Sequence, residues 1–171
     1  WRFATDGPVR YAPAVAGNVA YVGSDDGWIY ALHIQDGSLL WRHRPGPEDR
    51  RIPGNDRIIS AWPIRSGVLV DRGTVFATAG LYPEQGVFAC ALNATHGAVR
   101  WQQSLDVSPE GYLLSTDNLL IVPTGRASPI GLDRETGQFV RAFDTGGGTY
   151  AVASHGELFG GPGNQGSLAA L

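Results

Sequence analysis

The chain has 171 residues, of which 43% are hydrophobic and 17% are charged, and its formal net charge is −3. This balance is typical of a globular domain and gives no reason to expect a nucleic-acid partner. No apolar run reaches the roughly 18 residues of a membrane-spanning helix, so we expect no membrane insertion. Twenty-four Gly and 11 Pro residues argue against a helical bundle and favour short strands joined by tight turns.

The first strands are expected between residues 14 and 41. Four apolar, strand-like runs lie at 14–16, 19–22, 28–33 and 38–41, with polar turns between them. The second and third turns end in Asp26-Gly27 and Asp36-Gly37. Such pairs are strong hairpin signals because glycine tolerates a positive φ. The segment therefore predicts one antiparallel sheet of four strands.

The next segment, residues 43–57 (HRPGPEDRRIPGNDR), does not follow this pattern and is expected to be an inserted loop. Together with Arg42 it carries five of the 13 basic residues, namely Arg42, Arg44, Arg50, Arg51 and Arg57. Loops on a rigid scaffold often carry function, and guanidinium groups bind carboxylates through paired hydrogen bonds. One interpretation is that the last four arginines bind a protein partner. The other is a solvated loop whose charge is balanced by Glu48, Asp49 and Asp56.

An eleven-residue phrase recurs along the chain, at residues 31–41 (ALHIQDGSLLW), 91–101 (ALNATHGAVRW) and 131–141 (GLDRETGQFVR). A second shared block precedes each phrase, at 17–23, 73–79, 117–123 and 156–162. The distance from its first residue to a later Leu is 15, 19, 15 and 15 residues. A period of roughly 40 residues indicates units that bury their apolar faces only against neighbouring units.

Four-stranded units of this length predict an all-β propeller with antiparallel blades. The repeat units are expected at about 8–41, 60–101, 109–141, and 149–171 together with 1–3. Usual propeller wiring places the inserted loop at the same end as the turns at 24–27 and 80–86. Function in propellers commonly lies in such end loops.

The phrase Ala-x-Asp-x-x-x-Gly-x-x-x-Trp resembles the tryptophan-docking motif of the pyrroloquinoline-quinone-like repeat family, the quinoprotein alcohol dehydrogenase-like propellers. The resemblance implies a seven- or eight-bladed propeller in which each Trp packs between adjacent blades. The matching positions are the docking residues Trp41 and Trp101 and the turn residues Gly37, Gly97 and Gly137.

Three positions depart from this motif. His33 and Asn93 replace the acidic residue that is present at Asp133, and Arg141 stands where a third Trp is expected. We therefore expect a weaker interlock between the third and fourth units.

The two ends of the chain resemble complementary parts of the phrase. Trp1-Arg2-Phe3 is similar to its end and 169–171 to its start, and the chain contains no Met. We expect a segment of a larger protein, with three complete blades between two partial ones. Either the N-terminal strand closes a four-bladed ring, or the chain is half of an eight-bladed propeller completed by further sequence or a second copy. Open strand edges also favour self-association.

The resemblance also raises the possibility of a quinone-dependent dehydrogenase, in which the cofactor sits beside a calcium ion and often against adjacent cysteines. The one cysteine, Cys90, lies in a strand-like run and is expected to be buried and inert. Asp25 and Asp26 are candidate calcium ligands, but a hairpin turn before Gly27 also explains them. The histidines (His33, His43, His96 and His155) show no metal-binding spacing. We predict no catalytic residue, metal site or cofactor, with pyrroloquinoline quinone and calcium as the alternative.

The predicted function is a non-catalytic binding or scaffold propeller in a larger bacterial extracytoplasmic protein, mediating protein–protein interaction or assembly. The alternatives are a fragment of a quinone-dependent dehydrogenase, a sensor region attached to a membrane kinase, and a structural spacer. A location on the periplasmic or extracellular side of a bacterial membrane is implied by the resemblance alone.

Overall fold

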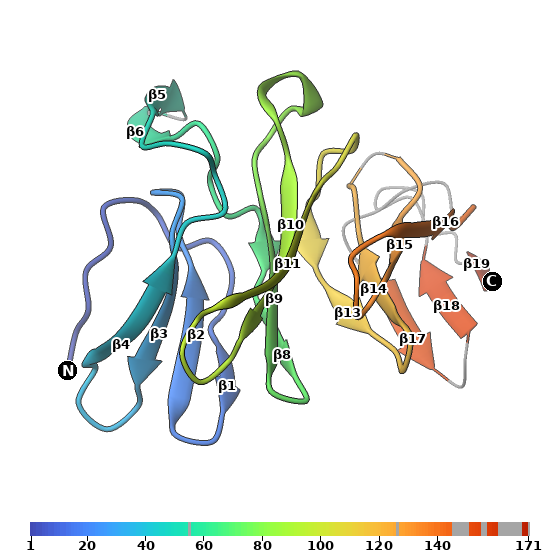
Figure 1. Cartoon of the computed structure of the whole chain (residues 1–171). Helices are drawn as coiled ribbons and strands as arrows, with labels where there is room; N and C mark the ends of the chain where they lie inside the picture. Colours follow the sequence, from blue (N-terminus) through green and yellow to red (C-terminus); the bar gives the residue numbers. More distant parts are fainter. Residues whose placement is uncertain (55, 126, 145–150, 155–156, 161–168, 171) are drawn as a thin grey trace.

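Three four-stranded antiparallel sheets and a three-stranded sheet lie side by side in a computed structural model of the chain (Figure 1). The structure describes residues 1–171 except 55, 126, 145–150, 155–156, 161–168 and 171. Within the described residues, no helix has the length and apolar character needed to cross a membrane. The all-β propeller class predicted from the sequence is confirmed.

The strands of each sheet follow the chain in order. The first sheet holds β1 (Ala14–Ala16), β2 (Val19–Gly23), β3 (Ile29–His33) and β4 (Leu39–His43). The second holds β8 (Leu69–Asp71), β9 (Thr74–Ala79), β10 (Phe88–Asn93) and β11 (Val99–Ser104). The third holds β13 (Leu114–Ser115), β14 (Leu119–Val122), β15 (Ile130–Asp133) and β16 (Phe139–Ala142). The fourth holds β17 (Ala151–Ser154), β18 (Glu157–Gly160) and β19 (Ala169–Ala170). Gly156 and Leu171, on which the fourth repeat register rests, lie outside the described residues.

The repeat is visible in the turn between the third and fourth strands of each complete sheet. Gly37, Gly97 and Gly137 have φ values of 72°, 72° and 73°, a left-handed conformation that favours glycine. The amide of each glycine donates to the carbonyl four residues earlier, at 2.8 Å in all three turns. The recurring Gly of the phrase is therefore a requirement of the turn.

The core lies between consecutive sheets. Side chains including Tyr21, Trp41 and Val75 form one buried cluster between the first two sheets. Residues including Phe76 and Leu132 form a second cluster between the second and third sheets. Each sheet thus buries its face only against its neighbours, as the repeat period predicts.

Two features differ from the expected pattern. The segment 43–57, expected as a loop, contributes to a hairpin of β5 (Arg51–Gly54) and β6 (Arg57–Ser60). In addition, β7 (Ser66–Gly67) pairs in parallel with β12 (Gly111–Tyr112), which ties together the chain entering the second and third sheets. A short 3-10 helix, η1 (Pro83–Gln85), lies between β9 and β10.

Candidate functional site

Indole rings connect neighbouring sheets through one recurring contact. The Nε1 of Trp41 donates to the carbonyl of Ala94 at 2.9 Å, and its ring lies over Gly97, where a Cβ would come within 2.7 Å of the ring. Trp101 donates to the carbonyl of Arg134 at 2.9 Å and lies over Gly137, with a corresponding distance of 2.4 Å. These glycines are therefore needed both for the turn and for the approach of the indole.

Trp1 makes the same contact with the first sheet. Its Nε1 donates to the carbonyl of Ile34 at 2.6 Å, and a Cβ on Gly37 would lie 2.4 Å from the ring. The acceptors Ile34, Ala94 and Arg134 occupy the same position of the repeated phrase. Arg141, at the place of a third docking Trp, instead lies 4.7 Å from the ring of Phe143 on an exposed strand. The weaker interlock expected there stays a prediction.

The acidic position of the phrase works differently in the three turns. Asp133 Oδ1 accepts from the amides of Glu135 and Thr136, and Asn93 Oδ1 accepts from those of Thr95 and His96. In the first turn His33 makes no such contact, and Asp36 accepts from the amide of Ser38 at 2.9 Å instead. The side-chain amide of Asn93 therefore takes the place of the acidic residue in the second turn. In the first turn the carboxylate of Asp36, three residues after His33, takes that place.

Asp26 belongs to the turn between β2 and β3 and is completely buried. Its Oδ1 accepts from the amide of Trp28 at 3.0 Å, and its Oδ2 accepts from the amide of Asp6 at 3.0 Å and the hydroxyl of Tyr30 at 2.7 Å. Burial and this hydrogen bond raise the pKa of Tyr30. The carboxylate thus fixes the turn and holds the N-terminal segment against it.

Asp25, also completely buried, lies between two arginines. Arg10 Nε is 2.7 Å from Oδ2, and Arg65 Nε is 3.6 Å from Oδ1. The backbone of Asp25 bonds on both sides, accepting from the amide of Ser60 at 2.7 Å and donating to the carbonyl of Pro8 at 2.9 Å. Asp25 therefore joins the N-terminal segment to β6.

These contacts do not make a calcium site of the two aspartates. Both carboxylate oxygens of Asp26 accept hydrogen bonds from protein donors, and Asp25 is paired with guanidinium groups. Over the part of the chain that the structure describes, which excludes His155, no three His, Cys, Asp or Glu residues are grouped as metal ligands. Asp25 and Asp26 are therefore occupied by protein groups, and the expected absence of a cofactor stays a prediction.

Cys90 is completely buried in β10, with its Sγ 3.7 Å from the carbonyl of Ala77. Burial raises the pKa of the thiol to about 12. The thiol is therefore protonated at neutral pH. The predicted burial of Cys90 is confirmed, and its inertness stays a prediction.

The inserted hairpin lies at the end of the sheets that carries the β2–β3 and β9–β10 connections (Figure 1). Trp62, just after β6, donates through Nε1 to the carbonyl of Gln85 at 2.9 Å. A Cβ on Gly27 would lie 2.6 Å from the hydroxyl oxygen of Ser60. The expected sharing of one end by the insertion and the turns at 24–27 and 80–86 is confirmed.

Three of the four arginines predicted to bind a partner are engaged within the molecule. Arg44 lies 4.3 Å from the ring of Trp28 and 3.0 Å from a carboxylate oxygen of Asp49. Arg51 is 3.3 Å from Asp49 and 3.8 Å from Asp6, and Arg50 lies 4.9 Å from the ring of Trp62. Asp49, considered as a local counter-charge, does pair with two of them.

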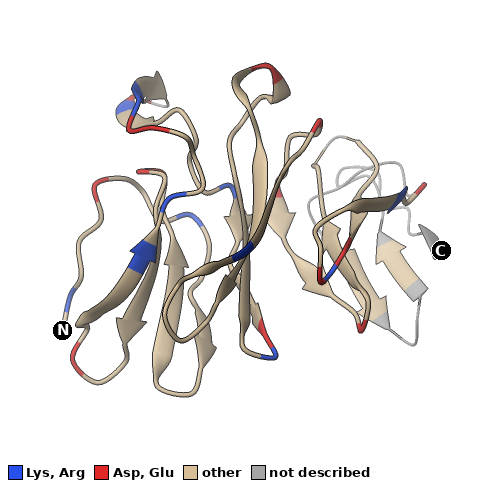
Figure 2. Ribbon diagram, in the orientation of Figure 1, with Lys and Arg blue, Asp and Glu red and all other residues tan. Residues whose placement is uncertain are grey.

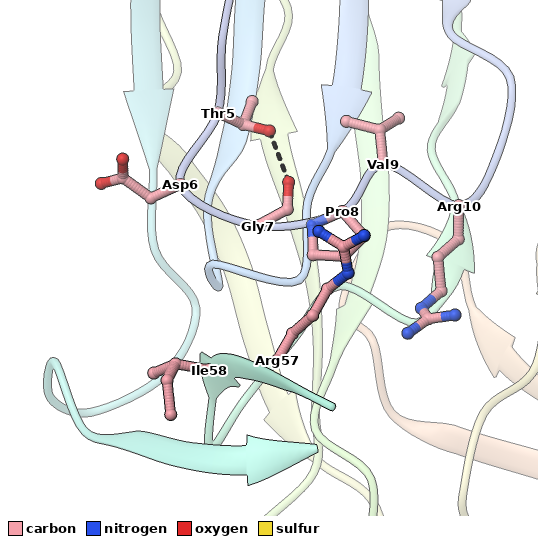
Figure 3. Close-up of a pocket in the computed structure, with 8 residues that line it drawn as sticks. All are labelled: Thr5, Asp6, Gly7, Pro8, Val9, Arg10, Arg57 and Ile58. Atoms are coloured by element: carbon pink, nitrogen blue, oxygen red, sulfur yellow. Dashed lines mark hydrogen bonds between the residues drawn. The ribbon is translucent and has the colours of Figure 1, made fainter. Parts of the chain in front are cut away.

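Arg57 is the arginine of this group that faces a groove. A cavity of about 710 Å³ separates the N-terminal segment from β6 and is lined by Thr5, Asp6, Gly7, Pro8, Val9, Arg10, Arg57 and Ile58 (Figure 3). Arg57 points from the hairpin toward the N-terminal segment, and among the described residues it makes no ion pair. Val9 and Ile58 are 45% and 58% exposed, so the groove combines a guanidinium group with apolar side chains.

Arginines and acidic residues both lie at this end of the molecule (Figure 2). Figure 2 shows Arg on the hairpin and beneath it, at the upper end of the first two sheets. The sequence contains no Lys, so all 13 basic residues are arginines, which stay charged at every physiological pH.

Sequence analysis missed a buried ion pair between the second and third sheets. Arg134, only 4% exposed, donates through Nη1 to Oδ2 of Asp71, and Ser115 donates to the same oxygen at 2.9 Å. Partial burial alone would raise the pKa of Asp71, but the hydrogen bonds from Arg134 and Ser115 outweigh it and lower the pKa. No local pattern marks this pair, because its members are far apart in sequence.

Solved structures with the same fold include a designed protein, an assembly factor and an enzyme. The computationally designed Ika4 protein is 17% identical, with a TM-score of 0.71 over 98% of this chain and 92% of that chain. BamB from Moraxella catarrhalis is 16% identical, with a TM-score of 0.63 over 92% and 46%. The quinohemoprotein alcohol dehydrogenase ADHIIG from Pseudomonas putida HK5 is 16% identical, with a TM-score of 0.60 over 86% and 30%.

This chain therefore spans less than half of the BamB chain and less than a third of the dehydrogenase chain. A sequence comparison with curated proteins gives no match. The model of one sequence family, described as outer membrane protein assembly factor BamB, matches residues 1–62 and 57–158. The repeat, the sheets and this match together show that the chain belongs to the BamB family of pyrroloquinoline-quinone-like repeat β-propellers.

Proposed function

We propose that the chain is a non-catalytic scaffold that binds a protein partner through the groove between residues 5–10 and β6. The observation that carries this proposal is Arg57, which faces an open groove beside exposed apolar side chains while Arg44 and Arg51 are paired internally. A guanidinium group with no ion-pair partner among the described residues can bind a carboxylate of another protein without breaking an existing pair. Membership of an assembly-factor family supports a role in assembling proteins.

The same proposal includes a location of the chain on the extracytoplasmic side of a bacterial membrane. The family description names an outer membrane assembly factor, and BamB from Moraxella catarrhalis shares the fold. The partner is then a protein of the envelope. Sensing for a membrane kinase and spacing of other domains stay alternatives, with no contact in the structure that favours either.

A quinone-dependent dehydrogenase is the second candidate, because such enzymes share the fold. The residues argue against it, since Asp25 and Asp26 are buried and bonded to protein groups, and Cys90 is buried within a strand. The proposed function needs no cofactor. Titration with pyrroloquinoline quinone and Ca²⁺ is expected to leave the melting temperature and the quinone absorbance unchanged; a saturable shift in either would favour the enzyme.

Site-specific photo-crosslinking in bacteria tests the binding role. A photoreactive amino acid at Ile58 samples the groove, and one at Asn18, an exposed turn residue at the opposite end of the first sheet (Figure 1), is the matched control. We expect a discrete adduct with an envelope protein from position 58, lost on Arg57→Gln, and none from position 18. Equal adducts from both positions, or none from position 58, would contradict the proposal.

Self-association through open strand edges is a separate proposal. Among the described residues the fourth sheet has three strands where the first three sheets have four, so a further strand could pair at its edge. The mass from sedimentation equilibrium distinguishes the alternatives: about twice 18.2 kDa supports pairing of two copies, whereas a monomer at all concentrations argues against it.

A further inference from the structure

Three stretches of backbone lie beside one another at the floor of the groove. The amide of Asp25 donates to the carbonyl of Pro8 at 2.9 Å, and its carbonyl accepts from the amide of Ser60 at 2.7 Å. Asp25, which lies in the turn between β2 and β3, therefore bonds to the backbone of both segments.

A cavity lies beside Asp25, between the N-terminal segment and β6. The cavity has a volume of about 710 Å³, with Thr5, Asp6, Gly7 and Val9 on one side and Arg57 and Ile58 on the other (Figure 3). This gap, with backbone on both sides, has room for a short extended segment of another chain.

The edge of β6 that faces this gap carries free hydrogen-bonding groups. The amide of Ser60 points away from β5, because it donates to Asp25. Backbone groups of a strand point alternately to its two edges, so the amide and carbonyl of Ile58 point the same way. Ile58 lies opposite Pro53 in a pair whose backbone groups do not bond to each other. A proline, which has no amide hydrogen, is tolerated at such a position. Among the described residues, the amide of Ile58 has no partner outside the hairpin.

We propose that the groove binds an extended, acidic segment of the partner protein, which adds as a strand between β6 and residues 5–10. This inference rests on the proposed function and specifies the form of its ligand. The added strand bonds to the amide and carbonyl of Ile58, which gives affinity independent of its side chains. Its apolar side chains contact Val9 and Ile58, which are 45% and 58% exposed. A carboxylate binds Arg57, so acidic segments are selected over basic ones.

The test uses the whole chain and a short peptide with blocked ends in which valine and aspartate alternate. Binding is measured by fluorescence anisotropy. We expect saturable binding, and weaker binding with rising salt. The same peptide with its alternate amides N-methylated keeps its charge and loses backbone donors, and a version with lysine for aspartate keeps its backbone and reverses its charge. Both are expected to bind at least about fivefold more weakly.

Variants of the chain test the same contacts from the other side. Ile58→Pro removes one outward amide at a position that already faces a proline, and Ile58→Val is the matched control that keeps it. We expect about a fivefold loss of affinity for the first and less than a twofold change for the second. Circular dichroism verifies that both variants are folded. If Ile58→Pro does not fold, the N-methylated peptide still tests whether the backbone hydrogen bonds contribute to binding.

The outcomes separate this inference from the proposed function. If methylation and Ile58→Pro leave affinity unchanged while Arg57→Gln weakens it, the groove binds acidic partners through charge alone, and strand addition is wrong. If the peptide fails to bind the folded chain at millimolar concentration, strand addition is likewise wrong, and the crosslinking at Ile58 decides the proposed function by itself. Equal binding of the lysine peptide contradicts the acidic preference.

Discussion

At the junctions between sheets the same contact is repeated, whereas at the groove every contact is particular to its place. Trp41 and Trp101 each donate to the same phrase position of the next sheet and lie over its turn glycine. The groove instead depends on Asp25, which links the N-terminal segment to an inserted hairpin by backbone bonds and pairs with Arg10. The contacts between sheets are therefore encoded by the repeat, and the proposed binding groove by residues that depart from it.

The largest expected effect is the loss of a docking indole. Trp41→Ala or Trp101→Ala removes a buried ring and leaves a cavity between two sheets, so each should lower the free energy of unfolding by about 3–5 kcal/mol. Urea denaturation followed by circular dichroism measures this change. A loss below about 1 kcal/mol would show that the rings do not hold the sheets together.

Two glycine substitutions separate the effect of the indole contact on stability from the effect of backbone strain in the turn. Gly137→Ala places a Cβ 2.4 Å from the ring of Trp101 at a φ of 73°, and we expect it to cost about 2–4 kcal/mol. Gly73→Ala is the control, because it has a φ of 72° but no atom within 4 Å of the new Cβ, and should cost about 1–2 kcal/mol. Equal losses in thermal or urea unfolding would mean that the indole contact adds nothing.

The ion pair between the second and third sheets gives a pH-dependent effect. Asp71→Asn should lower the free energy of unfolding by about 1–2 kcal/mol at pH 7, because Arg134 stays buried without its counter-charge. The pKa of Asp71 is lowered in the folded chain, so its contribution is complete above its ordinary value near 4 and declines as the pH falls through the folded value. The stability difference between the two proteins should therefore shrink in acid. A difference that does not change between neutral and acidic pH would contradict the pairing.

The smallest expected effect on stability belongs to the groove. Arg57→Gln should change the free energy of unfolding by less than about 0.5 kcal/mol, since Arg57 is exposed and has no ion pair among the described residues. Calorimetry of the two proteins measures it. A loss comparable with that of a docking indole would mean that the hairpin is part of the core, and that binding and stability are not separated.

Sequence reasoning located the sheets because their determinants are local. Gly37, Gly97 and Gly137 recur at fixed positions because each turn requires a positive φ. The strand-like runs lie between these turns. The hairpin β5–β6 was missed because Pro53 and Gly54 were read as loop residues. Ile52 and the pair Ile58-Ile59, on either side of a short polar turn, were a signal that could have revealed it.

The groove could not be predicted, because it is made by tertiary contacts. Asp25 was interpreted as a turn residue or a metal ligand, and nothing near it in the sequence indicates that its charge pairs with Arg10 and Arg65. Equally, composition showed an arginine-rich segment but not which guanidinium groups were already engaged. Only the structure distinguishes Arg57, at the groove, from Arg44, which pairs with Asp49.

The most direct test of this separation is amide hydrogen exchange, resolved by residue with NMR, for the folded chain with and without the valine–aspartate peptide. The account predicts slower exchange at Ile58 and along residues 5–9 on binding, with no change in β9 and β10 between the docked sheets. Unchanged exchange at Ile58 together with protection in the turns at the opposite end would contradict it.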